Sequence, residues 1–465
     1  AGVALGFMFT EQPDVALLFA AAIGLYSVQA LWREGVRGAR GWLRFLAPLI
    51  MAAAIPFGMT AYEAYLDNIK GTAIEQENTA NKWAFATQWS WPPEETIDFI
   101  APGYMGWRSG EPEGPYWGRM GGAEEQKLRN FKLENQYLGL IPLTLAIMGA
   151  MCAWRRRELQ SGDQSDLRFW SILVAISFLL ALGKYFPLYW LFFKLPFVSS
   201  IRNPNKFLQV FQFGLGILAA HGMDVLLSAG AAGKKEAPEP FAWLRRFTWV
   251  LLGLGGLLVL WMLGSLAAWS GAVHEFSVEG WGAFSEIIVR NRFLALAHAA
   301  GLAFVAAGFI HGIRNALRRS GSRLAPALAW ALVLVVAIDA AWLSRNYVKA
   351  FPMRFFELNE PLKTLVTVNR ENRTAMVTKE SFYNTWLTYQ FPFHNIQCTE
   401  FPQMPRMPED YRRFLKALNP QPIRKWQLCA VATVIGPSEL WANLHKDINL
   451  RSAFELIQSF NVAQN

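Results

Sequence analysis

Residues Phe247–Ala268, FTWVLLGLGGLLVLWMLGSLAA, decide the fold class of this chain. The stretch contains no charged residue, and Arg245 and Arg246 come directly before it. A hydrocarbon core about 30 Å thick requires about 20 residues in helical conformation, which this stretch supplies. The sequence therefore predicts a transmembrane helix whose first turn lies at the membrane surface that favours positive charge.

Seven further apolar runs precede and follow this stretch. They are Val15–Trp32, Leu46–Met59, Tyr137–Trp154, Phe169–Leu182, Phe207–Leu226, Phe293–Ile313 and Leu324–Leu343. Two of them are short, and they reach spanning length only with flanking residues. A hydrophobic content of 53% and a mean hydropathy of +0.18 fit several spans joined to sizeable aqueous segments. We expect a polytopic α-helical membrane protein of about eight spans, with the lipid bilayer as its first partner.

Arginine and lysine are concentrated on every second connection between these runs. The basic connections are Arg33–Phe45, Arg155–Arg168, the one with Lys234, Lys235, Arg245 and Arg246, and the one with Arg314, Arg318, Arg319 and Arg323. The positive-inside bias places these four in the cytoplasm. By alternation, the outer segments are Thr60–Gln136, Gly183–Lys206, Trp269–Arg292 and the chain after Leu343. Topology thus explains the formal charge of +9, and we expect no nucleic-acid partner.

The predicted organisation is a transmembrane domain of residues 1–343 followed by an extracytoplasmic domain of residues 344–465. In the second part, Arg373–Thr378 and Trp426–Ile435 have the composition of strands. Tyr411–Leu418 and Leu450–Phe460 have the pattern of helices. These patterns predict a small α/β domain.

Cys398 and Cys429 lie in this outer domain, where an oxidising compartment would permit a disulfide. Whether they pair is left open by the sequence. The apolar piece Ala1–Phe9 is too short to span and has the character of the end of an earlier helix, so we expect further spans upstream. A cleaved signal peptide is the alternative interpretation.

The outer loop Thr60–Gln136 is rich in side chains suited to sugar chemistry. Carboxylates such as Glu63 and Asp98 can act as general bases. Flat aromatic faces stack on sugar rings. The aromatic candidates are Trp91, Tyr104, Trp107 and Tyr116. An aromatic belt at the membrane interface, with acids that are merely solvated, is the competing interpretation.

The second outer segment, Gly183–Lys206, contains a stretch bracketed by Pro187 and Pro196 that predicts a re-entrant or interfacial helix. Its basic residues are Lys184, Lys194, Arg202 and Lys206, and it has no acid. An excess of positive charge on the outer side suggests a lipid phosphate as ligand. Ordinary anionic headgroups, or the acidic loop Thr60–Gln136, are the alternatives.

Asp339 lies inside the last predicted span, where a carboxylate is costly and indicates a functional site by default. The structural alternative is a pair with Arg345 or Lys349 just beyond the span. His298, inside the seventh span, is expected to hydrogen-bond a neighbour. The chain has no His-Glu-x-x-His, Cys-x-x-Cys or Walker pattern, which disfavours a metalloprotease and an ATP-driven transporter.

The order of several short motifs resembles the YfhO-like family of bacterial membrane proteins. The motifs are Ala54-Ile-Pro-Phe-Gly-Met-Thr-Ala-Tyr-Glu63, Trp91-Pro-Pro, Pro102-Gly-Tyr-Met-Gly, Tyr137-Leu-Gly-Leu-Ile-Pro-Leu, Leu182-Gly-Lys, Leu195-Pro-Phe, Arg202-Asn-Pro-Asn-Lys-Phe, His221-Gly-Met-Asp and Asp339. That family is similar to the GT-C membrane glycosyltransferases, which transfer a sugar from a polyprenyl-phosphate carrier to an acceptor outside the cytoplasm.

The resemblance implies a glycosyltransferase in the bacterial inner membrane that acts on a cell-envelope acceptor. Asp98, Glu63 and Asp339 would be the candidate catalytic acids, although the usual GT-C base would lie upstream of Ala1. Arg202, Lys206 and Lys184 would bind the donor phosphate, and Trp91, Tyr104, Trp107 and Tyr116 would bind sugar or acceptor. No nucleotide or soluble cofactor is implied, and a divalent cation could assist.

Two other functions compete with this one. A non-catalytic scaffold or assembly subunit of a membrane complex would account for an incomplete catalytic apparatus and would bind membrane-protein partners. A lipid or polysaccharide transporter would need a polar path through both halves of the membrane, of which the inner halves of these spans show little.

Overall fold

The computed structural model describes residues 2–36, 38–47, 50–51, 54, 78–120, 132, 136–154, 161–195, 202–228, 242–318, 324–348, 350, 352–368, 371–378, 381–400, 407–448 and 450–459. The described residues belong to two compact units, one within the first 349 residues and one from Ala350 onward. We call them the helical unit and the C-terminal unit.

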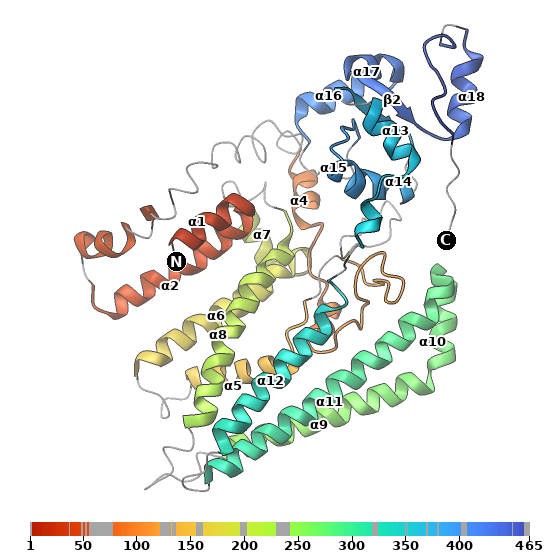
Figure 1. The fold of residues 1–465 in the computed structure, drawn as a ribbon. Helices are drawn as coiled ribbons and strands as arrows, with labels where there is room; N and C mark the ends of the chain where they lie inside the picture. The colour runs from red at the N-terminus through yellow and green to blue at the C-terminus, as the bar shows by residue number, and fades with distance from the viewer. Residues whose placement is uncertain are drawn as a thin grey trace. The chain divides into compact units, whose positions relative to one another are not determined.

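The described residues of the helical unit form six helices that are long and apolar enough to cross a membrane (Figure 1). They are α2 (Pro13–Arg33), α6 (Ser161–Ala181), α8 (Phe207–Ser228), α9 (Ala242–Ala267), α11 (Ser285–Arg318) and α12 (Leu324–Ser344). Six of the eight predicted runs are thereby confirmed as long apolar helices. The run at Tyr137–Trp154 gives a shorter apolar helix, α5 (Leu140–Trp154), and most of Leu46–Met59 lies outside the described residues.

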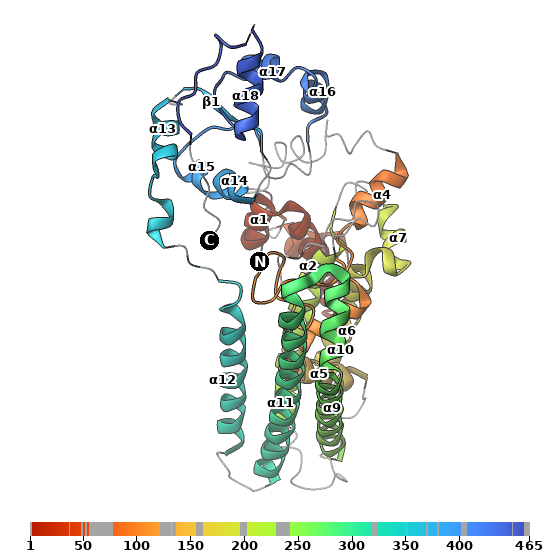
Figure 2. The same ribbon diagram turned by 90° about the vertical axis from the view of Figure 1, so that its right-hand side faces the viewer.

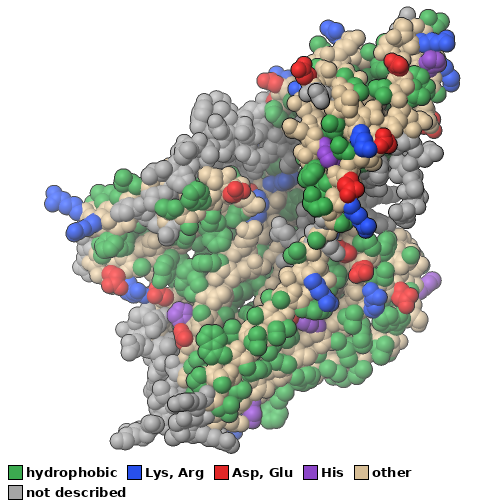
Figure 3. Space-filling model, in the orientation of Figure 1, with side chains coloured by type: hydrophobic (Ala, Val, Ile, Leu, Met, Phe, Trp, Pro, Cys, Tyr) green, Lys and Arg blue, Asp and Glu red, His purple; other side chains and the backbone are tan. Residues whose placement is uncertain are grey.

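Several of these helices direct large apolar side chains outward. Only 17% of the most apolar 18-residue stretch is buried in α9 and in α12. Residues such as Trp249 and Trp330 are largely exposed. Figure 3 shows hydrophobic side chains along α9 and α11 on the face that it presents. Exposure of so many large apolar side chains to water would be unfavourable in free energy, whereas contact with lipid hydrocarbon is not. This pattern is therefore typical of a membrane protein.

Close helix packing holds the helical unit together. Helix α11 packs against α9, α12 and α5, and α8 packs against α5 and α6 (Figures 1 and 2). At the crossing of α5 and α8, a Cβ atom on Gly149 would lie 2.3 Å from the carbonyl oxygen of Leu218, and one on Gly222 would lie 1.9 Å from that of Leu145. Only glycine permits this approach, as is common where helices associate in membranes.

Short helices and turns fill the connections. They are α1 (Gly2–Glu11), α4 (Thr79–Thr87), η2 (Pro93–Phe99), η3 (Gly183–Tyr185), α7 (Leu188–Phe193), η5 (Pro204–Lys206), α10 (Trp269–Phe276), η7 (Ser277–Trp281) and η8 (Gly282–Phe284). Among the described residues of the segment predicted to be re-entrant, Leu188–Phe193 form the six-residue α7, which begins directly after Pro187. Several aromatic residues of the loop before α5, among them Trp91, Phe99 and Tyr116, enter the same apolar core as α6 and α8.

The C-terminal unit is built around a two-stranded parallel sheet. Strand β1 (Arg373–Met376) pairs with β2 (Val431–Ile435), with Ala375 opposite Val434 and Met376 opposite Ile435. The surrounding helices are η9 (Met353–Phe356), α13 (Glu360–Val368), α14 (Ser381–Thr385), η10 (Trp386–Gln390), α15 (Phe391–Phe393), α16 (Glu409–Leu418), α17 (Pro422–Leu428) and α18 (Ser438–Lys446). Within the described residues, Cys398 and Cys429 are free thiols.

The predicted strand at Arg373–Thr378 and the predicted helix at Tyr411–Leu418 are confirmed. Only the end of Trp426–Ile435 is a strand, since its start belongs to α17. The predicted helix at Leu450–Phe460 is wrong: its described residues, 450–459, form a turn followed by chain without regular secondary structure. The Phe454 ring packs edge-on against Trp426 at 6.1 Å, so a tertiary contact outweighs the local helical pattern.

Candidate active site

Asp98 lies in η2 and is completely buried. Its Oδ2 atom lies 2.5 Å from the Nζ atom of Lys132, which is equally buried, and its Oδ1 atom accepts a hydrogen bond from the backbone N–H of Met105. The Lys132 ammonium also lies 5.6 Å from the Trp91 ring centroid and 5.2 Å from that of Tyr116. Burial raises the pKa of Asp98, and the Lys132 charge opposes that shift. The structure thus groups three predicted residues, Asp98, Trp91 and Tyr116, around a lysine in a closed interior.

Glu95, one helical turn before Asp98, is also fully buried. Tyr116 donates a hydrogen bond of 2.5 Å to its Oε1 atom, and the backbone N–H of Arg119 donates another of 3.0 Å. Its Oε2 atom has no hydrogen-bond partner among the described residues. Burial raises the pKa of this carboxyl group as well. The neighbouring Glu94 instead forms a solvent-exposed ion pair with Arg119.

Tyr104 takes part in a different cluster, at the start of α11. Its hydroxyl accepts a hydrogen bond of 3.0 Å from Arg292, whose guanidinium also lies over the rings of Tyr104, Trp117 and Phe276. The Tyr104 ring additionally packs against Trp261 of α9. These contacts fix the loop to α9, α10 and α11.

The basic residues predicted to bind phosphate are engaged in separate contacts. Lys206 forms an ion pair with Asp14 at the start of α2. The Arg202 guanidinium lies 5.2 Å from the centroid of the Phe85 ring, and Lys184 is exposed above the ring of Tyr185. The segment just before η5 is fixed to α4, because the backbone N–H of Asn203 donates a hydrogen bond to the carbonyl oxygen of Ala86.

Asp339 of α12 is the centre of a polar cluster between helices. Its Oδ1 atom lies 2.9 Å from Nε2 of His298 on α11, and its Oδ2 atom accepts a hydrogen bond of 2.6 Å from Tyr137 just before α5. The His298 ring stacks on the Trp342 indole, with centroids 5.1 Å apart and planes inclined by 13°. The sequence alternative, a pair of Asp339 with Arg345, is not what the structure shows: Arg345 lies over Trp342. Lys349 lies outside the described residues.

His298 lines a cavity of about 320 Å³ bounded by the loop, α11 and the end of α12. Trp107 forms part of the wall and meets Trp342 edge-on at 6.4 Å, while the Tyr347 hydroxyl donates to the Trp107 carbonyl oxygen. The remaining polar lining consists of Glu111, Glu113, Arg290, Asn291, Arg345 and Asn346. Aromatic side chains, two carboxylates, two guanidinium groups and a histidine that lies next to a third carboxylate therefore line one cavity.

This cavity is our candidate active site. Trp107 lines this cavity, and Asp339 contacts His298, which also lines it. The other predicted residues do not line it: Asp98, Trp91 and Tyr116 are buried together, Tyr104 holds Arg292, and the phosphate candidates Arg202, Lys206 and Lys184 lie in other contacts. Glu63 lies outside the described residues.

Several residues of this site carry no distinctive sequence signal. Arg290, Glu111 and Glu113 are charged residues of a kind common at helix ends and in loops, and Arg345 was considered only as a possible partner of Asp339. His298 was assigned a neighbour without that neighbour being identified. A pairing of the polar residues in the two last predicted spans, His298 and Asp339, would have been the available clue.

A histidine beside a carboxylate is a common arrangement for general acid–base catalysis, and here the two groups lie 2.9 Å apart. Within the described part of the chain, no group of three or more His, Cys, Asp or Glu side chains is placed to hold a metal ion. Comparison with protein-family models, with curated proteins and with solved structures found no match in any of the three.

Proposed function

We propose that this chain is a membrane glycosyltransferase that transfers a sugar from a polyprenyl-phosphate carrier to an acceptor on the outer side of the membrane. The observation that carries the proposal is the cavity in which His298, supported by Asp339, faces the same space as Trp107, Arg290 and Arg345. Each part suits one component of such a reaction.

The base in this proposal is His298. Its Nε2 atom lies 2.9 Å from Asp339 and 3.3 Å from the Tyr137 hydroxyl, so Nδ1 would be the atom that accepts the proton of the acceptor hydroxyl as it attacks the anomeric carbon of the donor. The Tyr137 hydrogen bond to the other oxygen of Asp339 keeps that carboxylate oriented. Asp339 therefore acts through the histidine, and Asp98 serves the fold because it is buried against Lys132.

The leaving group in this proposal is the lipid phosphate, which departs as the sugar moves to the acceptor. Arg290 and Arg345 are both exposed and both line the cavity, and guanidinium groups stabilise the charge that develops on phosphate oxygens. They replace Arg202, Lys206 and Lys184 as the donor-phosphate residues. The aromatic walls, Trp107 and Trp342, supply faces for a sugar ring, and the membrane surface supplies the lipid carrier.

The test compares His298→Ala with His311→Ala, which changes an exposed histidine of the same helix outside the cavity. The purified chain in lipid nanodiscs is assayed for sugar release from a panel of polyprenyl-phosphate hexoses. A missing general base slows such a reaction by about 10²–10⁴-fold. We expect a loss of this size for His298→Ala at unchanged protein abundance, and full activity for His311→Ala.

A non-catalytic scaffold is the rival function. It is supported by the buried contacts of Asp98 with Lys132 and of Glu95 with Tyr116, which serve the fold. If the wild-type chain releases no sugar from any donor in the panel, yet purifies with a stoichiometric membrane-protein partner, the transferase proposal fails and the scaffold replaces it.

A further inference from the structure

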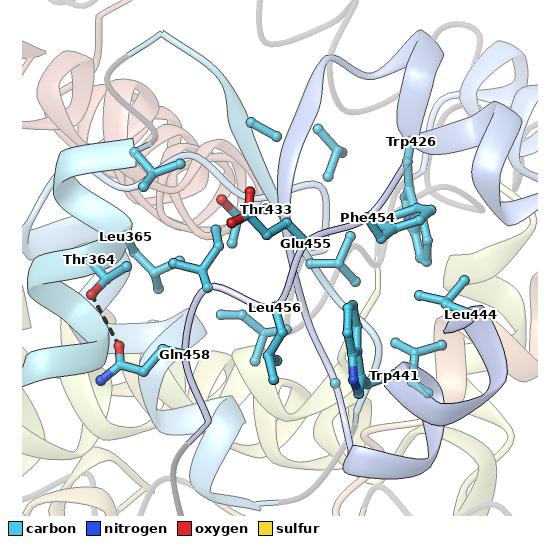
Figure 4. A pocket seen from close by; sticks show the side chains of 18 of the residues that line it. Thr364, Leu365, Trp426, Thr433, Trp441, Leu444, Phe454, Glu455, Leu456 and Gln458 are labelled. Carbon is cyan, nitrogen blue, oxygen red and sulfur yellow. Dashed lines mark hydrogen bonds between the residues drawn. The ribbon is translucent and has the colours of Figure 1, made fainter. Parts of the chain in front are cut away.

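The C-terminal unit has a cavity of its own, of about 520 Å³. Its walls come from α13, β2, α17, α18 and the irregular chain Ala453–Gln458 (Figure 4). Small-molecule sites in proteins typically measure about 300–1,000 Å³, so this cavity has the size of a ligand site. Its construction depends only on this unit and not on the transfer chemistry proposed above.

Aromatic rings supply much of its apolar wall. Trp441 projects from α18 into the cavity between Leu444 and Leu456 (Figure 4). His445, one helical turn later, stacks on this indole with centroids 5.1 Å apart and planes inclined by 30°. That contact holds the ring in the cavity wall. Trp426 forms the far wall and is fixed there by Phe454.

The polar lining consists of neutral side chains and one acid. Thr364 and Gln458 are joined by a hydrogen bond of 3.0 Å at one side of the cavity, and Thr433 and Gln427 line it as well. Glu455 is the one charged residue of the lining among the described residues, and no Lys or Arg of that part of the chain belongs to it. Hydroxyl, amide and carboxylate groups can bind a ligand rich in hydroxyl groups, whereas an anionic ligand would find no cation.

We propose that this cavity binds a neutral saccharide, with one sugar ring against Trp441 and its hydroxyl groups bonded to Thr364, Gln458 and Glu455. Pyranose rings combine an apolar face with a polar rim, which matches an indole wall edged by amides and hydroxyls. A lipid tail would bring the Glu455 carboxylate into an apolar surrounding, at a cost in free energy. A phosphorylated sugar or a uronic acid would be repelled by the Glu455 carboxylate, and no cation of the described lining would offset that repulsion.

Binding of maltose, cellobiose and diacetylchitobiose to the full chain would be measured by isothermal titration calorimetry. The chain is held in nanodiscs, because maltoside detergents would compete for the cavity. We expect at least one of these sugars to bind and a disaccharide of glucuronic acid not to bind. Trp441→Ala should weaken the affinity about tenfold or more through loss of ring contact. Tyr389→Ala, a partly exposed aromatic of the same unit outside the cavity, should leave it unchanged.

Two further variants keep the outcome decisive. Trp441→Phe retains a ring and should lose less affinity than Trp441→Ala, and Thr364→Val should weaken binding without removing a large side chain. His298→Ala should bind the sugar as the wild type does, which separates this proposal from the transferase. The proposal is overturned if none of the three sugars binds, if Trp441→Ala and Thr364→Val both bind normally, or if the glucuronic acid disaccharide binds as tightly as the neutral ones.

Discussion

At the scale of single residues, the most consequential pair is Asp98 and Lys132. Two charges removed from water cost several kcal/mol each, and they are tolerated here because each is the other's partner. Removal of one member leaves a buried charge without compensation. The pair therefore secures the loop before α5 to the apolar core, and a catalytic role for Asp98 would require that closed interior to open.

We predict that Lys132→Met lowers the free energy of unfolding by about 3–5 kcal/mol, because Asp98 would remain buried and unpaired. The double variant Asp98→Asn/Lys132→Met should regain most of this loss, since the introduced amide oxygen can still accept the hydrogen bond from Met105. The matched control is Arg119→Met, which breaks an ion pair that is about half exposed and should cost less than about 1 kcal/mol. Unfolding in detergent followed by circular dichroism provides the measurement, and equal losses in the two single variants would contradict this interpretation.

At the scale of helices, the glycine contact between α5 and α8 determines how closely the two backbones approach. Gly149 and Gly222 face each other there, while Gly216 of the same α8 has open space where a Cβ would lie. The two positions in α8 thus separate the need for close packing from the intrinsic helix propensity of glycine.

We predict that Gly222→Ala destabilises the protein by about 1–3 kcal/mol, because the added methyl group would collide with the Leu145 carbonyl and push α5 away. Gly216→Ala should be neutral or stabilise the protein by up to about 1 kcal/mol, as alanine is the better helix former. Thermal unfolding of both variants in the same detergent distinguishes them. Our account of this crossing would be wrong if the two substitutions had the same effect.

At the scale of the whole molecule, the long apolar helices were the most predictable feature, because hydrocarbon imposes length and composition on every span. The C-terminal strands were predictable from Val and Thr content, but the helix expected at Leu450–Phe460 was not formed, because Phe454 packs against Trp426. Local pattern carries no information about such a partner.

The candidate site was predicted only in part, for the same reason. Asp339 could be found because a carboxylate within a span is unusual. The sequence does not distinguish Lys132 or Arg290 from other charged residues. Lys132 pairs with Asp98, 34 residues away, and Arg290 lines the cavity, and both facts follow only from the tertiary structure. The aromatic residues of the loop were predicted as one group, yet the structure distributes them between a buried core and a cavity wall.

We propose that the basic connections between the spans lie in the cytoplasm, which would place the cavity at the end of α12 on the outer side of the membrane. The most direct test is cysteine accessibility in a variant whose three native cysteines are replaced. Met353→Cys follows α12 and is well exposed, and Arg246→Cys lies at the exposed start of α9. We predict that a membrane-impermeant maleimide labels position 353 in intact cells and position 246 only after permeabilisation. Labelling of position 246, but not of position 353, in intact cells would contradict the account.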